Sequence, residues 1–576
     1  MIFHPPSWLP AIAQNLTELG TISDFVLRGP PGVASESELE PPVLTSADAQ
    51  KSKTPRQIAK DVEELAAGLA HDLQWSPNVD LPGGKVVAIL SENTLDYLTY
   101  CWAIQRVGGT CLLLHATTSP EENAKHLRHS NCNVLITSPS LLDSGRAATA
   151  IANESGRRLY LTEPVTSAKT NGTNETNSPN GTKEKLKTIN ELLALGSSID
   201  HLPVSDWSSK ESKSKIAYLC PTSGTSGVQK LARLTHVSII ANILQLVALE
   251  RISRHRDVEV VLGVLPMSHV QGIVASHTSI YVRDHFILHT KFDMKETLAS
   301  IQTHRINRLY LVPSVLSTLI GNPFLFKAFD LSSVDTIYVG AGSVTAELYA
   351  KTKAVQPGWN MVTGYGLTES PAAVAMSSPH EYIPGSVGVL LPSYKARLCR
   401  EDGSEVESFD VPGELLLASP NQADGYLGDD DGKAATFREG WLHTGDMALF
   451  RRSPEGDAHL CIVDRLRDMI KVKGMQVAPV TIEECLRQHP SVADVAVIGV
   501  PDDLFGERPK AFVMRPKQVD QGADLIDPDE LFDQLDDFIE SKLTESHWIR
   551  GRYEILEMLP RNTSGKVSKG VLRMRG

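Results

Sequence analysis

A run of hydroxyl-bearing and small residues follows the short apolar segment 216–219 and ends in a lysine. Its glycines permit backbone angles that are closed to other residues, so the main chain can approach a ligand closely. Successive backbone N–H groups in such a turn form a concave anion site, and a lysine ammonium adds a point charge for phosphate. The stretch predicts a polyphosphate-binding loop made of Thr222, Ser223, Gly224, Thr225, Ser226, Gly227 and Lys230.

This loop departs from the common nucleotide-binding motif, in which glycine directly precedes lysine and serine or threonine follows it. Here Val228 and Gln229 stand between the last glycine and Lys230, and Leu231 comes next. A solvated surface turn is the alternative interpretation, because serine, threonine and glycine are common in turns. Segments farther along the chain distinguish the two.

Composition restricts the class of protein. The 576 residues are 41% hydrophobic and 22% charged, which is typical of a globular protein with several domains. A net charge of −13 and a pI near 5.8 argue against general affinity for nucleic acid. The seven cysteines show no CxxC spacing, so neither a disulfide framework nor a zinc site is indicated. We expect no membrane span, no signal peptide and no C-terminal peroxisomal tag, and therefore a cytoplasmic protein.

The loop belongs to a chain in which strands and helices alternate. Short apolar runs predict strands at 86–90, 111–114 and 133–137, and residues 94–107 carry apolar side chains at helical spacing. Ser119-Pro120 is a favourable helix start. This order implies a parallel sheet with right-handed crossovers. After the loop, strands are predicted at 258–265, 286–289, 309–312 and 336–339, and helices at 294–304 and 315–320.

Two changes of pattern divide the chain. Residues 167–185 are too polar to bury a core, and we predict a disordered surface insertion there. The last hundred or so residues follow a shorter α+β pattern, including a helix at 528–543 that Asp527 caps. The sequence predicts an α/β protein with a large N-terminal body of parallel-rich sheets and flanking helices, residues 1–463, and a small mobile α+β domain, residues 464–576. Residues 1–55 are expected to wrap the surface.

Five further motifs accompany the phosphate loop in a fixed order. In this order and spacing they resemble the adenylate-forming superfamily, which includes acyl- and aryl-CoA ligases, firefly luciferase and peptide-synthetase adenylation domains. The coumarate–CoA ligase branch is the most similar. The motifs are Gly263-Val-Leu-Pro-Met-Ser-His-Val-Gln-Gly272, Val339-Gly-Ala-Gly-Ser343, Gly364-Tyr-Gly-Leu-Thr-Glu-Ser370, Gly440-Trp-Leu-His-Thr-Gly-Asp446 and Leu559-Pro-Arg-Asn-Thr-Ser-Gly-Lys566.

The resemblance implies a two-step reaction. A small-molecule carboxylic acid attacks the α-phosphorus of ATP and gives an acyl-adenylate and pyrophosphate. The thiol of coenzyme A then attacks the adenylate and gives a thioester and AMP, with Mg2+ as the metal ion. Two alternatives stay open: transfer of the acyl group to a carrier protein, and nucleotide binding without turnover. The few residues after Lys566 leave no room for a carrier domain, which favours a free-standing CoA ligase.

The resemblance also implies nucleotide contacts. Glu369 corresponds to the magnesium ligand and Thr368 to the α-phosphate contact. A hard divalent cation prefers carboxylate and phosphate oxygens, so one carboxylate beside a phosphate loop is chemically sensible. Asp446 corresponds to the ribose-binding aspartate, whose two oxygens can accept from both hydroxyls, and Arg465 to a second ribose contact. The remaining nucleotide contacts would be Gly340, Ala341, Gly342, Thr363, Gly364, Tyr365, Lys471 and Gln476.

Lys566 has the central catalytic role by this resemblance. The adenylation transition state gathers negative charge between the carboxylate and the α-phosphate, and one positioned donor there typically gives about 10²–10³-fold acceleration. Arg467 occupies the hinge, where relatives usually carry lysine or aspartate. Around it the small domain would pivot, so that Lys566 serves the first step and Lys473-Gly474 lines the thiol tunnel in the second. A solvated surface lysine is the alternative for Lys566.

The acid pocket is the least conventional part of the pattern. His269 matches a histidine beside the substrate carboxylate, and a core histidine at a strand end is its alternative. Gln271 replaces an aromatic residue that coumarate ligases often carry. Amino-acid adenylation domains use an aspartate near this position, and none is present here. The other predicted walls are Val270, Ser314, Gly340 and Val374, which together suggest an apolar slot with some polar lining.

Overall fold

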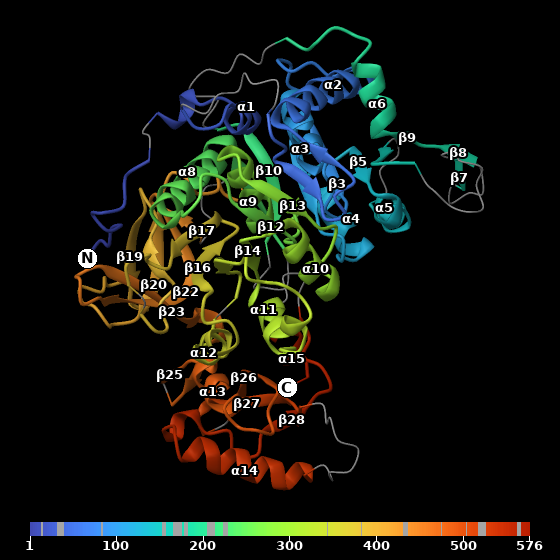
Figure 1. The fold of residues 1–576 in the computed structure, drawn as a ribbon. Coiled ribbons are helices and arrows are strands. Elements are labelled where there is room, and N and C mark those ends of the chain that lie inside the picture. The colour runs from blue at the N-terminus through green and yellow to red at the C-terminus, as the bar shows by residue number, and fades with distance from the viewer. Residues whose placement is uncertain are drawn as a thin grey trace.

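The computed structural model describes the chain apart from sixteen short stretches (Figure 1). These are residues 13–14, 32–39, 82–83, 153–156, 165–174, 178–182, 204–213, 223–228, 343, 382, 430–435, 474, 503, 517–525, 562–565 and 576.

A seven-stranded sheet carries the phosphate loop, in the order β11-β10-β4-β3-β5-β6-β9. All neighbours are parallel except β10 and β11, which form an antiparallel pair. The predicted strand–helix alternation is therefore confirmed here. The strands are β3 (Val86–Leu90), β4 (Thr110–Leu114), β5 (Val134–Thr137), β6 (Arg158–Leu161), β9 (Lys187–Thr188), β10 (Ile216–Pro221) and β11 (Leu231–Thr235).

Alternating side chains bury both faces of this sheet. Val87 and Ile89 of β3 face the main core, where they pack with α2 (Pro55–Leu73) and α3 (Tyr97–Arg106). Ala88 and Leu90 face the opposite side, against α4 (Pro120–His129) and α5 (Leu142–Ile151). The predicted start of α4 is confirmed, because the Ser119 hydroxyl accepts a hydrogen bond from the Glu122 backbone N–H. Helix α6 (Ile189–Gly196) packs on α2.

A fourteen-stranded sheet forms the centre of the molecule. The strands β1, β13, β12, β14, β15 and β16 are parallel to one another. The edge strand β2 pairs antiparallel with β1, and at the other side the pairing turns antiparallel from β16 onward. The strands are β1 (Leu44–Ser46), β2 (Ser52–Lys53), β12 (Val260–Gly263), β13 (His285–Leu288), β14 (Arg308–Leu311), β15 (Thr336–Val339), β16 (Asn360–Leu367), β17 (Ser370–Met376), β18 (Gly388–Leu390), β19 (Lys395–Cys399), β20 (Gly413–Ala418), β21 (Phe437–Arg438), β22 (Trp441–Arg452) and β23 (Ala458–Arg465).

Helices cover both faces of this central sheet. Helices α8 (His236–Ser253) and α9 (Val270–Tyr281) lie in the main core between the two sheets, whereas α10 (Met294–His304), α11 (Pro313–Ile320) and α12 (Ala346–Val355) pack around a second core. By length and composition α8 could cross a membrane, with a mean hydropathy of 1.2, but 72% of it is buried inside the protein. Its apolar composition is therefore explained by its position as a core helix.

The last part of the chain builds a separate small sheet with its own core (Figure 1, orange to red). Its long helix α14 begins at Pro528, and the Asp527 carboxylate accepts from the Asp529 backbone N–H at 3.0 Å, as predicted. The elements are β24 (Ile470–Val472), β25 (Met475–Val477), α13 (Pro479–Leu486), β26 (Asp494–Asp502), β27 (Gly506–Met514), α14 (Pro528–Glu540), β28 (Tyr553–Ile555) and α15 (Lys569–Arg573).

Two expectations from the sequence need correction. The N-terminal 55 residues do more than wrap the surface: Phe3 stacks on Phe450 with ring centroids 3.9 Å apart, and α1 (Ile22–Arg28) stacks Phe25 on Tyr281 of α9. Their apolar residues are sparse, so periodicity missed them. Within the predicted disordered insertion, β7 (Glu175–Asn177) and β8 (Lys183–Lys185) pair as antiparallel strands. Residues 167–174 and 178–182 of that insertion lie outside the described residues.

Candidate active site

Several of the predicted site residues follow parallel strands of the central sheet. In Figure 1, the helices α11 and α12, which follow two of these strands, lie next to the small domain. Strands β12, β14 and β15 run parallel, so their carboxyl ends share an edge. The chain after β12 leads to His269, the chain after β14 to Ser314, and the chain after β15 to Gly340. The topology thus brings together residues that are far apart in sequence.

A buried carboxylate forms the best-defined part of the site. Asp446 is 3% exposed. It accepts a hydrogen bond from the Tyr365 hydroxyl at 2.5 Å, and its other oxygen lies 3.0 Å from Arg465 Nε. Asp446 and Arg465 are also direct cross-strand partners on β22 and β23. Burial would lower the pKa of Arg465, but the adjacent Asp446 carboxylate raises it. Asp446 therefore contacts two other residues that were predicted for the nucleotide pocket.

A second carboxylate, Glu369, lies in the turn between β16 and β17 together with Thr368. Its Oε1 accepts a hydrogen bond of 2.6 Å from the hydroxyl of Tyr426. The Lys230 ammonium lies 4.6 Å from the centroid of the same tyrosine ring. Tyr426 thus links two predicted site residues, and the sequence analysis missed it, because a single tyrosine between strands carries no motif.

The phosphate loop is the connection between the antiparallel strands β10 and β11. At its two ends, the Thr222 N–H donates to the Lys230 carbonyl at 2.8 Å. The Gln229 amide Oε1 lies 2.9 Å from Nε2 of buried His126 on α4. This contact ties the end of the loop to helix α4, which covers the sheet. Ser223, Gly224, Thr225, Ser226 and Gly227 lie outside the described residues.

The predicted adenine wall follows β15 and has little room for side chains. A Cβ on Gly340 would lie 3.0 Å from the Gln271 amide nitrogen, and one on Gly342 would lie 3.3 Å from Pro313. Ala341 has a φ of 63°, a left-handed conformation that residues other than glycine adopt at a cost. Thr363 is fixed by Ser377, whose hydroxyl accepts from its backbone N–H at 2.9 Å. Gly364 lies on the adjacent strand β16, opposite Met376.

The predicted acid pocket brings two histidines together. The rings of His269 and His115 lie 4.4 Å apart by centroid, with His269 preceding α9 and His115 following β4. Burial lowers the pKa of His115. His115 was not predicted, because it belongs to a different sheet. Val270, Gln271 and Ser314 are half-buried, and Val374 is completely buried. Their role as walls of the acid pocket stays a prediction.

Lys566 of the small domain meets the charges of the large body. Burial lowers the pKa of Lys566, Arg465 lowers it further, and the carboxylates of Asp446 and Glu369 oppose that shift. The Lys566 side chain keeps solvent-exposed surface, so a ligand can reach it. The ammonium therefore lies at the nucleotide side of the interface between the domains.

The predicted hinge residue Arg467 lies in the short turn Leu466–Asp468 between β23 and β24. Asp468 holds this turn, because it lies 3.8 Å from Arg467 Nε and 2.5 Å from the guanidinium of Arg573. Burial lowers the pKa of Arg467. The turn connects the two domains and is pinned by the C-terminal helix.

The other predicted residues of the small domain are engaged elsewhere. The Lys471 ammonium lies 2.9 Å from the Glu401 carboxylate of the large body, and the Lys473 ammonium lies 4.2 Å from the Phe505 ring centroid. Gln476 is exposed opposite Lys471 on β25. Gly474 lies outside the described residues. Their contacts with adenylate and thiol stay predictions.

The residues present suit a divalent cation that arrives with phosphate. Among the described residues, no group of three or more His, Cys, Asp or Glu side chains could hold a metal ion. Glu369 offers a single carboxylate near Lys230, linked through Tyr426. Magnesium commonly binds through one or two carboxylates plus substrate phosphates, so this arrangement fits the magnesium complex of ATP.

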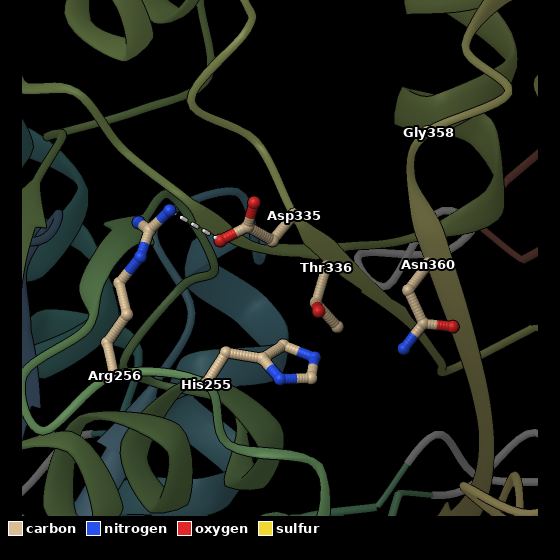
Figure 2. Close-up of a pocket in the computed structure, with 6 residues that line it drawn as sticks. All are labelled: His255, Arg256, Asp335, Thr336, Gly358 and Asn360. Carbon is tan, nitrogen blue, oxygen red and sulfur yellow. Dashed lines mark ion pairs between the residues drawn. The ribbon is translucent and has the colours of Figure 1, made fainter.

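A cavity of about 320 Å³ lies elsewhere on the large body (Figure 2). Thr336 and Asn360, at the first residues of β15 and β16, line it together with Arg256, which pairs with Asp335 at 2.9 Å. It lies at the amino ends of these strands, whereas the predicted site lies at their carboxyl ends. None of the predicted site residues lines it.

Comparisons with known proteins agree with this geometry. The sequence profile of AMP-binding enzymes matches residues 34–427, and that of the AMP-binding enzyme C-terminal domain matches residues 481–566. The acyl-CoA ligase easD of Emericella nidulans is 39% identical, with 100% of both chains covered. The acyl-CoA ligase frbB of a Dothideomycetidae species is 39% identical, with 98% of both chains covered.

Solved structures share the fold. ATP-bound MatB from Rhodopseudomonas palustris superposes with a TM-score of 0.76 at 24% identity, covering 96% of this chain and 98% of that one. The anthranilate CoA ligase AuaEII, in complex with anthranoyl-AMP, has a TM-score of 0.76 at 22% identity, covering 99% of this chain and 98% of that one. The large body and the smaller C-terminal domain thus have counterparts in known structures.

Proposed function

The chain belongs to the AMP-binding enzyme family and is an ATP-dependent acyl-CoA ligase, and on that premise we propose how its residues carry out the reaction. A small-molecule carboxylic acid is first adenylated, and coenzyme A is the acceptor of the acyl group. One observation carries the proposal. The Lys566 ammonium of the small domain interacts electrostatically with Arg465, Asp446 and Glu369 of the large body.

The ribose end of ATP is held by Asp446. Its two oxygens already accept from Tyr365 and Arg465, and those contacts fix the plane of the carboxylate. A carboxylate whose orientation is fixed in advance can accept from two adjacent hydroxyls with little loss of conformational freedom. The glycines after β15 leave a flat space for adenine, and Lys471 and Gln476 would add adenylate contacts.

The triphosphate end lies between the phosphate loop and Glu369. ATP enters as its magnesium complex, and the cation supplies charge neutralisation for the phosphates. Lys230 contributes a positive charge, the Thr222 hydroxyl contributes a donor, and Thr368 contacts the α-phosphate. The negative field of an acidic protein is thereby offset locally at the binding site.

The first bond forms between a carboxylate oxygen of the acid and the α-phosphorus, and the bond to the pyrophosphate oxygen breaks. The Lys566 ammonium stabilises the negative charge that gathers between the two reactants. His269, beside Val270 and Gln271, separates the acid slot from the adenylate. Because Lys566 lies at the nucleotide side here, this conformation suits the first step.

The second step requires a different contact set. The small domain turns about Arg467, which removes Lys566 from the adenylate and brings Lys473-Gly474 to it. The thiol of coenzyme A then attacks the acyl carbon, and AMP leaves. Hinges of this kind are commonly a few residues at the ends of elements. Transfer to a carrier protein is the alternative second step.

The test uses the purified full-length protein with a panel of carboxylic acids, ATP and Mg2+. We expect pyrophosphate release and hydroxamate trapping with a subset of acids, and an acyl-CoA product by mass spectrometry when coenzyme A is added. Release of pyrophosphate without any thioester would favour the carrier-protein alternative. If no acid releases pyrophosphate or supports exchange of labelled pyrophosphate into ATP, the protein binds nucleotide without turnover.

A further inference from the structure

We propose that Tyr426 is a positioning residue for adenylation: its hydroxyl orients the Glu369 carboxylate and its ring face holds the Lys230 ammonium, so that magnesium-bound triphosphate meets both groups in fixed places. The inference rests on the proposed function for the roles of Glu369 and Lys230. It adds a residue that none of the motifs contains.

Two different parts of one side chain make the two contacts. The Tyr426 hydroxyl donates to Glu369 Oε1 at 2.6 Å, and Lys230 Nζ lies 4.6 Å from the ring centroid. A hydrogen bond to a charged acceptor is stronger than one between neutral groups. A lysine ammonium within about 6 Å of an aromatic face is attracted by its quadrupole. One tyrosine therefore spaces an anion and a cation that would otherwise attract each other directly.

Tyr426 itself is firmly held. The side chain is 6% exposed, and Phe437 packs edge-on against its ring with centroids 5.6 Å apart. Its backbone pairs with Ala232 as an isolated antiparallel bridge beside β11, the strand that follows the phosphate loop. The Leu427 N–H donates to the Leu231 carbonyl at 2.8 Å. Residues 426 and 427 are thus attached to the strand that begins directly after Lys230.

The same segment is also attached to the Glu369 turn. The Ala423 N–H donates to the Glu369 carbonyl at 2.9 Å. Residues 423–427 therefore connect β11 to the β16–β17 turn through both backbone and side-chain contacts. A carboxylate has no proton to give, so the Tyr426 hydroxyl is the donor of this hydrogen bond and Glu369 Oε1 is the acceptor.

The positioning matters because Glu369 also interacts with positive groups other than Lys230. Its charge acts on both Arg465 and Lys566. Without the phenol, rotation about the glutamate side chain would allow the carboxylate to turn toward these cations. The hydrogen bond to Oε1 holds it toward the Lys230 side, where the terminal phosphates are proposed to bind.

Two substitutions separate the two contacts. Tyr426→Phe removes the hydroxyl and keeps the ring, and Tyr426→Leu removes both. Tyr160→Phe is the matched control, because Tyr160 lies on β6, outside the proposed site, and its hydroxyl donates to the Asp72 carboxylate of α2. Binding of ATP is measured by calorimetry with Mg2+ and with EDTA, and pyrophosphate exchange is measured over a range of Mg2+ concentrations.

We expect Tyr426→Phe to weaken ATP binding about tenfold with Mg2+ and to leave binding in EDTA unchanged, since a hydrogen bond to a charged group is worth roughly that factor or more. The Mg2+ concentration for half-maximal exchange should rise by a similar factor. Tyr426→Leu should also weaken binding in EDTA, because Lys230 loses its support. Both Tyr426 variants should form thioester from supplied acyl-adenylate as fast as the wild type. The Tyr160→Phe control should match the wild type in ATP binding and in exchange.

A double-substitution cycle tests whether Tyr426 acts through Glu369. In a Glu369→Gln background, Tyr426→Phe should have no further effect on the Mg2+ dependence. Equal loss of ATP binding with Mg2+ and with EDTA, or full additivity with Glu369→Gln, would overturn the inference. Calorimetry measures ATP binding directly, so it tests the role of Tyr426 even if no acid supports pyrophosphate exchange by the wild type. Absence of exchange by the wild type would count against the proposed function and not against this inference.

Discussion

Replacement of Lys566 by alanine should separate the two half-reactions without affecting folding. Lys566 lies in a part of the site where Arg465 also contributes positive charge and where Asp446 and Glu369 contribute negative charge. Its ammonium is the one side-chain charge that the small domain is proposed to deliver to the reacting atoms. We expect Lys566→Ala to abolish most adenylation and to spare thioester formation from supplied acyl-adenylate.

The magnitude follows from the kind of interaction removed. One preorganised donor at a developing negative charge typically contributes about 10²–10³-fold in rate, which corresponds to roughly 3–4 kcal/mol of transition-state stabilisation. The effect should appear in kcat for pyrophosphate exchange, because the charge develops only in the transition state. Affinity for ATP alone should change much less.

The expected effect on stability has the opposite sign from that of a salt bridge. Burial and Arg465 lower the pKa of Lys566. A lysine whose pKa is lowered by folding binds its proton more weakly in the folded state, so at neutral pH the ammonium opposes folding. Removing it should therefore leave the free energy of unfolding unchanged or slightly higher.

The assay compares pyrophosphate exchange, thioester formation from synthetic acyl-adenylate, and thermal unfolding in the same preparations. Lys542→Ala is the control, since this lysine follows α14 on the small domain, donates to Gln488 at 2.9 Å and lies over Phe538. It should match the wild type in both half-reactions. Equal loss of both half-reactions in Lys566→Ala, with unchanged unfolding, would refute the two-conformation reasoning.

The remaining predictions concern buried groups. Asp446→Asn leaves Tyr365 an acceptor but deprives Arg465 of its charge partner, so ATP affinity should fall about 10–100-fold, as expected for charged hydrogen bonds; unchanged affinity by calorimetry would exclude the ribose role. Burial lowers the pKa of both His236 and His277 from 6.5 to about 3. Between pH 6.5 and about pH 3, only the unfolded chain protonates these two histidines. The free energy of unfolding should therefore fall as the pH decreases from 6.5, by roughly 1.4 kcal/mol per pH unit for each histidine. Denaturant unfolding at pH 7, 6 and 5 measures this slope, His236→Asn should make it shallower, and equal stability at pH 5 and 7 would contradict it.

Local patterns in the sequence predicted most elements of the parallel part of the fold. The run from Val86 to Leu90 is β3, the helix at Met294–His304 is α10, and the strand at Thr336–Val339 is β15, as predicted. These segments have near-continuous apolar runs or clear helical spacing, and each is buried on the sides that its pattern implies. The strands from β17 to β23 were not predicted. Two of them, β18 and β21, have three and two residues, which is too short for a recognisable pattern.

The sequence by itself determined the family of the protein and the residue types of its site, because glycines, hydroxyls and single charged residues recur in a fixed order that local chemistry can explain. Only the tertiary structure decided how these groups meet. The pairing of Tyr365 and Arg465 with Asp446, and the bridge that Tyr426 makes between Lys230 and Glu369, join segments from different strands. Hydrogen bonds and ring contacts depend on distances of a few ångströms, and the packing of the sheets sets those distances.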